Sequence, residues 1–176
     1  MDGLRYSCEI AARGVYGVRV AVRDDREMRA FMTDAMGFRS MGQDGRDSRF
    51  EVGDGAPGQV VEVTHIPDLA QGSWTFGEGT VHHVAFKVED HKRQADFKAY
   101  LEGLGYTDCS DAKERGYFTS VYFRTPGGAL FEAAYTLDGA FPRDETYENL
   151  GVNIQTPPWL VDKRDEIIAK LEPIAY

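Results

Sequence analysis

The sequence is poor in cysteine, has fewer basic than acidic residues and contains no long apolar run. Its two cysteines, Cys8 and Cys109, are too few for a disulfide framework and form no Cys-x-x-Cys metal pair. They favour reduced thiols in a reducing compartment. A membrane-spanning helix needs about 18 apolar residues in a row, which the chain lacks, and its first residues do not resemble a signal peptide. We therefore expect a cytoplasmic protein.

The charge balance limits the kinds of partner. The chain has 20 Lys and Arg against 29 Asp and Glu, a formal net charge of -9. A protein that binds nucleic acid needs a basic face to replace counterions, and an anionic membrane surface attracts basic segments. We expect neither partner. Because 42% of the 176 residues are hydrophobic, the chain can form one domain or two small modules with a shared core.

Residues 14–66 carry a pattern of a strand, a helix and further strands. Alternation from Tyr16 to Val22 predicts a half-buried strand. A helix follows, which Asp24 or Asp25 can cap and which Gly37 ends. The residues spaced for one face of this helix are Met28, Phe31, Met32 and Met36. Short strands are expected at residues 48–52 and 59–65, with a turn between them.

Residues 80–136 repeat the same order of elements. A strand over residues 80–88 precedes a helix that Asp90 can cap and Gly105 ends, and two strands follow at residues 119–124 and 129–136. The apolar stripe of that helix would be Ala95, Phe97, Tyr100, Leu101 and Leu104. The repeat predicts an α+β fold of paired βαβββ modules. Residues 67–79 would be the linker, and residues 137–176 a tail with a helix from about 161 to 171.

The residues best suited to chemistry are His82, His83 and Glu132. On a strand the two imidazoles would point to opposite faces, so that only one could face a given cavity. Glu132 lies among apolar residues, where an unpaired carboxylate is costly and needs a cation or a metal as partner. One His and one Glu on adjacent strands supply two of the three ligands of a two-His-one-carboxylate Fe(II) site. For the histidine pair alone, a core or surface role is the commoner alternative.

Other candidates are weaker when judged from the residues alone. Arg115, Tyr117 and Tyr122 could orient an anionic oxygen bound to a metal, but ordinary packing and a solvated charge are the favoured interpretation. We expect His65 and His91 to be surface residues.

Three segments together resemble a known family. Residues 79–86 (GTVHHVAF) and 115–132 (RGYFTSVYFRTPGGALFE) resemble the opening and closing strands of the last module of hydroquinone-type ring-cleaving dioxygenases, and residues 157–160 (PPWL) resemble their tail. These enzymes belong to the vicinal oxygen chelate (glyoxalase/bleomycin resistance/dioxygenase) superfamily. The resemblance implies a glyoxalase-like fold with a C-terminal helix.

The resemblance also implies roles for single residues. His83 and Glu132 match metal ligands, whereas His82, Arg115 and Tyr122 match residues that hydrogen-bond the substrate or shape its pocket. The metal would be Fe(II) or, as in some members, Mn(II). The substrates would be a small aromatic of the hydroquinone or catechol type and O₂, with cleavage of the aromatic ring.

The chain departs from the family in its extent. Full-length members have four βαβββ modules, of which this chain resembles the last two, and the other ligand histidine lies in the missing first module. In the first repeat Gly17 takes the place of His83 and Glu62 the place of Glu132, so we expect Glu62 to be non-catalytic. Residues 2–9 resemble the closing strand of a preceding module, which predicts a remnant strand within residues 1–13.

Three functional hypotheses remain open at this point. The chain could be a dioxygenase that is complete only with a partner, either a separate N-terminal half or another copy in a homo-oligomer. It could be a glyoxalase-fold module that binds small molecules without chemistry, or a catalytically incomplete remnant. The fold alone cannot choose among them.

Overall fold

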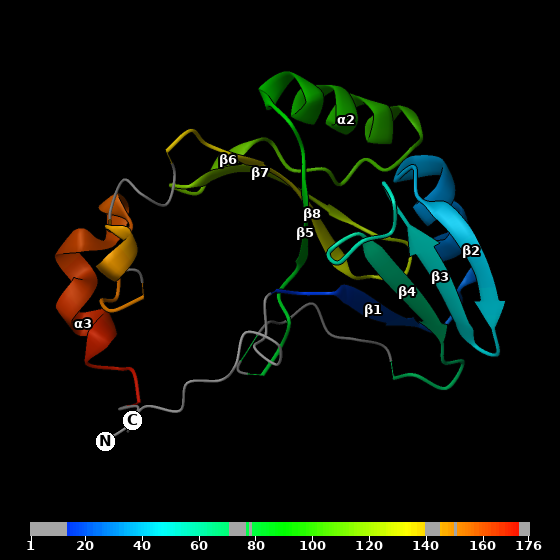
Figure 1. Ribbon diagram of the computed structural model, residues 1–176, viewed down its shortest axis with the longest axis horizontal. Helices are drawn as coiled ribbons and strands as arrows, with labels where there is room; N and C mark the ends of the chain where they lie inside the picture. The colour runs from blue at the N-terminus through cyan, green and yellow to red at the C-terminus, as the bar shows by residue number, and fades with distance from the viewer. Residues whose placement is uncertain (1–13, 71–76, 78, 140–144, 150, 173–176) are drawn as a thin grey trace.

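Two four-stranded sheets form the body of the protein in a computed structural model that describes residues 14–70, 77, 79–139, 145–149 and 151–172 (Figure 1). The strand orders are β1-β4-β3-β2 in the first sheet and β5-β8-β7-β6 in the second. In each sheet the first strand pairs in parallel with the last strand of its module. The α+β fold with paired βαβββ-like modules is confirmed.

The first module closely follows the predicted order. Its elements are β1 (Gly17–Val22), α1 (Arg26–Ala30), η1 (Phe31–Ala35), β2 (Arg39–Asp44), β3 (Asp47–Glu51) and β4 (Val60–His65). The sequence pattern missed β2, because every residue of this strand is exposed and no apolar alternation marks it.

The predicted helix of this module changes its form halfway. It continues from α1 into η1, which is a π-helix, and ends before Gly37, whose φ of 70° suits glycine. Met28, Phe31 and Met32 are buried, as their spacing predicted. Of the two predicted capping residues, Asp25 occupies the N-cap position without a side-chain hydrogen bond, whereas the Asp24 carboxylate accepts from the Arg26 backbone N–H at 2.9 Å.

The second module contains β5 (Val84–Lys87), α2 (His91–Gly103), β6 (Lys113–Glu114), β7 (Phe118–Arg124) and β8 (Leu130–Thr136). β5 begins at Val84 rather than Thr80, so that both histidines precede the strand. The Asp90 carboxylate accepts a hydrogen bond from the Arg93 backbone N–H at 2.7 Å, which confirms the predicted cap. β6 was missed because it has only two residues.

A buried amide, rather than an apolar stripe, anchors α2 to its sheet. Of the predicted stripe only Leu101 is fully buried and Phe97 half-buried, and the other members are exposed. Gln94 is 2% exposed and lies against the sheet instead. Its side-chain amide donates to the backbone oxygens of Thr119 at 2.7 Å and Ala133 at 2.8 Å, so helix α2 is tied to both β7 and β8.

Removal of this amide is expected to destabilise the fold. Gln94→Ala leaves one buried and one half-buried carbonyl group without this donor and opens a cavity, which should lower the free energy of unfolding by about 2–4 kcal/mol. Urea denaturation measures this difference. Lys92→Ala on the exposed side of the same helix is the control and should stay within about 0.5 kcal/mol of wild type. An equally small effect of Gln94→Ala would contradict the proposed anchor.

The two modules share one hydrophobic core. Phe31 of the first module is 1% exposed and packs against three rings of the second. Its ring centroid lies 5.0 Å from that of Tyr106 and 6.3 Å from those of Phe123 and Phe131. The opposite faces of the two sheets therefore remain available for polar residues.

The tail lies beside this two-sheet body (Figure 1). It contains η3 (Tyr147–Asn149), the 3₁₀-helix η4 (Pro158–Lys163) and α3 (Arg164–Ile168). The predicted helix is thus present, but it begins as a 3₁₀-helix at Pro158 and its α-helical part spans five residues. Proline suits this start because it fixes φ and the first helical positions need no N–H donor.

Other expectations fall partly outside the described residues. Residues 1–13, including Cys8, and much of the predicted linker 67–79 belong to that part, and the module boundaries stay predictions. Cys109 is a free, half-buried thiol. Within the described ranges no helix is long and apolar enough to cross a membrane, and the cytoplasmic location stays a prediction.

Candidate metal and substrate site

His83 and Glu132 meet on the face of the second sheet that points away from the core. The His83 Nε2 lies 2.7 Å from the Glu132 Oε2, and the Glu132 side chain is 5% exposed. Ala85 of β5 pairs with Glu132 of β8, and His83 lies two positions before Ala85, just ahead of the strand, which brings its ring to this part of the sheet. The predicted convergence of one imidazole and one carboxylate is present in the structure.

His82 lies beside His83 rather than on the opposite face. The two Nδ1 atoms are 2.7 Å apart and the ring centroids 5.0 Å apart. The expectation of opposite faces was wrong, because strand alternation applies only from Val84 onward. At this distance one Nδ1 donates and the other accepts, which couples the tautomers of the two rings.

Tyr122 and Arg115 complete the cluster. Tyr122 pairs with Glu132 across β7 and β8, and its ring centroid lies 5.6 Å from that of His83. The Arg115 Nε donates to the Tyr122 hydroxyl at 3.3 Å, and its guanidinium carbon lies 5.4 Å from the centre of the Tyr122 ring. All residues predicted to form the site therefore belong to one chain of contacts.

The other candidates lie elsewhere. His91 is exposed, as expected, and packs on the Tyr135 ring with centroids 4.6 Å apart. His65 is half-buried, with its Nε2 3.0 Å from the Arg23 backbone oxygen. Tyr117 lines a cavity together with Trp159, which no periodicity or spacing in the sequence placed near a site residue.

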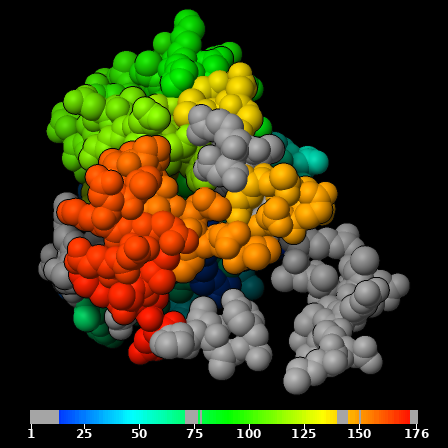
Figure 2. Space-filling model, turned by 90° about the vertical axis from the view of Figure 1, so that its left-hand side faces the viewer, coloured from blue at the N-terminus to red at the C-terminus, as the bar shows by residue number. Residues whose placement is uncertain are grey.

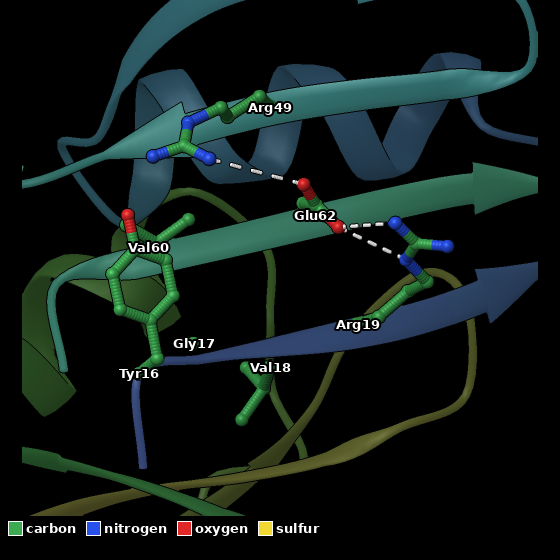
Figure 3. A pocket seen from close by; sticks show the side chains of 7 residues that line it. All are labelled: Tyr16, Gly17, Val18, Arg19, Arg49, Val60 and Glu62. Carbon is green, nitrogen blue, oxygen red and sulfur yellow. Dashed lines mark hydrogen bonds and ion pairs between the residues drawn. The ribbon is translucent and has the colours of Figure 1, made fainter. Parts of the chain in front are cut away.

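The first module carries a counterpart of this cluster without histidine (Figure 3). Arg19 pairs with Glu62 as Ala85 pairs with Glu132, and Arg49 pairs with Glu62 as Tyr122 pairs with Glu132. Glu62 thus takes the place of Glu132. By the same register Gly17 takes the place of His83.

Two guanidinium groups occupy the space around Glu62. Arg19 donates to the Glu62 Oε2 from Nε at 2.9 Å and from Nη2 at 2.6 Å, and the Arg49 Nη1 lies 3.9 Å from Oε1 (Figure 3). The hydrogen bond to Glu62 raises the pKa of Arg19 above its ordinary value. The pKa of Arg49 is raised first by its hydrogen bond to Tyr16 and then by that to Glu51. Permanent cations therefore compensate the Glu62 carboxylate.

The backbone of the first module also leaves little room for a ligand. A Cβ atom added to Gly17 would lie 3.0 Å from the Val60 backbone oxygen and 3.1 Å from the Val60 Cβ. A histidine at this position would have to displace its neighbour. That Glu62 is non-catalytic stays a prediction.

Two side chains of the second module, His83 and Glu132, are suitable ligands for a divalent metal. An imidazole nitrogen and a nearly buried carboxylate oxygen are ligands that Fe(II) and Mn(II) accept. Within the part of the chain that the structure describes, no three His, Cys, Asp or Glu side chains gather at one point. His83 and Glu132 would hold such an ion together with a ligand from another source.

No family model matches the chain, but single proteins and solved structures do. The chain is 43% identical over 167 residues to the chlorohydroquinone/hydroquinone 1,2-dioxygenase of Sphingobium indicum, covering 94% of this chain and 51% of that protein. A solved structure of a candidate dioxygenase from Bacillus subtilis superposes with a TM-score of 0.76 at 29% identity, covering 89% of this chain and 49% of that one.

A more distant match shows the fold alone. The fosfomycin resistance protein FosX of Listeria monocytogenes, solved in complex with Mn(II), has a TM-score of 0.56 at 16% identity, covering 74% of this chain and 95% of that one. The chain spans about half the length of the curated relatives that it matches. It belongs to the vicinal oxygen chelate (glyoxalase/dioxygenase) superfamily, and its relatives are ring-cleaving dioxygenases of about twice its length.

Proposed function

We propose that this chain is the metal-holding half of a ring-cleaving dioxygenase that acts on hydroquinone- or catechol-like aromatics with O₂. The observation that carries the proposal is the 2.7 Å approach of the His83 Nε2 and the Glu132 Oε2. A carboxylate that is 5% exposed is costly without a cationic partner, and a metal ion held between these two side chains would supply that charge.

Fe(II), or Mn(II) in its place, would be held by His83 and Glu132. A bound ion of this kind acts as a Lewis acid and passes electrons between the aromatic ring and dioxygen. The His82 imidazole contacts the His83 ring through the two Nδ1 atoms and would support its orientation toward Glu132 when a metal is held there. The sheet around Glu132 excludes water from one side of the ligand pair.

Arg115 and Tyr122 would bind the substrate. The Tyr122 hydroxyl and the Arg115 guanidinium lie together at 3.3 Å, next to the His83 ring. A hydroxyl and a cation in this arrangement can hold an ionised ring oxygen and keep the ring beside the metal ligands. This arrangement suits an aromatic that carries hydroxyl groups.

The third ligand would come from outside the two modules. We propose a histidine from a separate N-terminal half or from a second copy of the chain, since the relatives are about twice as long. A small-molecule binding module is the second candidate. It is favoured by the finding that only two ligand side chains meet within the described ranges.

Oxygen consumption tests this proposal. Fe(II)-loaded protein should take up O₂ with hydroquinone or catechol, either alone or after mixing with the half of the Sphingobium relative that this chain does not match. His83→Ala should lower the rate by at least about 100-fold, because loss of a direct metal ligand exceeds the 10- to 100-fold effect of its supporting groups.

Controls distinguish the two candidate functions. His65→Ala, which alters a histidine of the first module, should leave the rate unchanged. An unchanged rate in His83→Ala would contradict the dioxygenase proposal. Tight binding of the aromatic without metal and without O₂ uptake would support the binding module instead.

A further inference from the structure

A large cavity lies between the second module and the tail. It has a volume of about 760 Å³ and is bounded by the turn that joins β6 to β7 and by residues 155–161. Figure 2 shows the orange and red surface of the tail against the yellow-green surface of the second module. The volume falls in the range of about 300–1,000 Å³ typical of small-molecule sites.

Arg115 connects this cavity to the candidate metal site. It lines the cavity and also donates to the Tyr122 hydroxyl at 3.3 Å, while the Tyr122 ring lies 5.6 Å from the His83 ring. A molecule held by Arg115 can therefore extend from the metal ligands into the cavity. Arg115 is thus the residue that the cavity shares with the proposed substrate site.

The lining is chemically suited to an aromatic ring with an anionic oxygen. Trp159, Pro157 and Pro158 supply flat apolar surface on the tail side, and the Trp159 side chain is 58% exposed. The Arg115 guanidinium donates to the Tyr122 hydroxyl at 3.3 Å, and Glu114 also borders the cavity. Aromatic stacking and a guanidinium together favour a phenolate-type ligand.

We infer that this cavity holds the substituted side of the aromatic substrate and that Trp159 determines which ring substituents are accepted. The inference rests on the proposed function. A ring oxygen faces Arg115, and apolar ring substituents lie against Trp159 and the two prolines.

Calorimetric binding to the anaerobic, Fe(II)-loaded protein tests the inference, with chlorohydroquinone and hydroquinone as the probes. Trp159→Ala should raise the Kd for chlorohydroquinone by about tenfold and that for hydroquinone by about threefold or less, since only the former uses the apolar wall. Trp159→Phe should remain within about threefold of wild type for both, because an aromatic surface is retained. The Fe(II) affinity should be the same in all these variants.

Tyr147→Ala is the matched control. Tyr147 is an aromatic residue of the same tail, is 87% exposed and does not line the cavity, so its loss should leave both Kd values unchanged. Equal Kd values for wild type and Trp159→Ala, or no binding of either probe by wild type, would overturn the inference.

The two proposals can fail separately. Binding of chlorohydroquinone that depends on Trp159 in a protein that takes up no Fe(II) would sustain the cavity and refute the metal-dependent function. Fe(II) binding that depends on His83, with no effect of Trp159→Ala on either probe, would support the metal-dependent function and refute the role of the cavity.

Discussion

Glu132→Gln is expected to weaken Fe(II) binding by at least about 100-fold, because it replaces the anionic metal ligand with a neutral amide. The substitution preserves the shape of a side chain that is 5% exposed, so the fold should remain. An amide at this position can still hydrogen-bond the His83 Nε2, which lies 2.7 Å from Oε2. Anaerobic titration of the purified variant with Fe(II) measures the change.

The first module provides an internal control for this prediction. Glu62 occupies the equivalent register position but is compensated by Arg19 and Arg49. Glu62→Gln should therefore leave Fe(II) affinity unchanged. Equal losses in the two variants, or no loss in Glu132→Gln, would show that the His83–Glu132 pair is not the metal site.

Phe31→Ala is expected to lower the free energy of unfolding by about 3–5 kcal/mol. The Phe31 ring is 1% exposed and contacts aromatic rings of the other module, so its removal opens a cavity between the modules. Denaturant unfolding monitored by circular dichroism measures the loss. One shared core predicts a single transition that moves as a whole to lower denaturant concentration.

A surface substitution provides the comparison. Tyr147→Ala removes an aromatic ring that is 87% exposed and should change stability by less than about 0.5 kcal/mol. Two separate transitions in Phe31→Ala, with only one of them displaced, would contradict the shared core.

Much of the fold could be predicted because two segments of the sequence carry the same order of strands and helix. Buried apolar positions such as Met28 and Phe31 follow helical spacing, and Asp90 caps α2 through a local hydrogen bond. The features that the sequence did not predict depend on contacts between residues far apart in the chain. β2 is exposed throughout and is defined by its pairing with β3, and Gln94 is buried because two carbonyl groups of the sheet accept its amide protons.

Part of the site could be predicted because one of its residues breaks the pattern of its strand. Glu132 stood out as a carboxylate in an apolar strand, and strand adjacency brought it to His83. The orientation of His82 depends on where β5 begins, which strand alternation alone does not define. The compensation of Glu62 by Arg19 and Arg49 depends on the register of three strands, so a linear pattern does not reveal it.

The position of a bound metal tests the central claim most directly. Crystals of the protein grown with Mn(II) and measured for anomalous scattering should show one metal peak per chain, within bonding distance of the His83 Nε2 and the Glu132 Oε2. A peak beside Glu62, or a metal bound without either His83 or Glu132, would contradict the assignment of this chain as the metal-holding half of a dioxygenase.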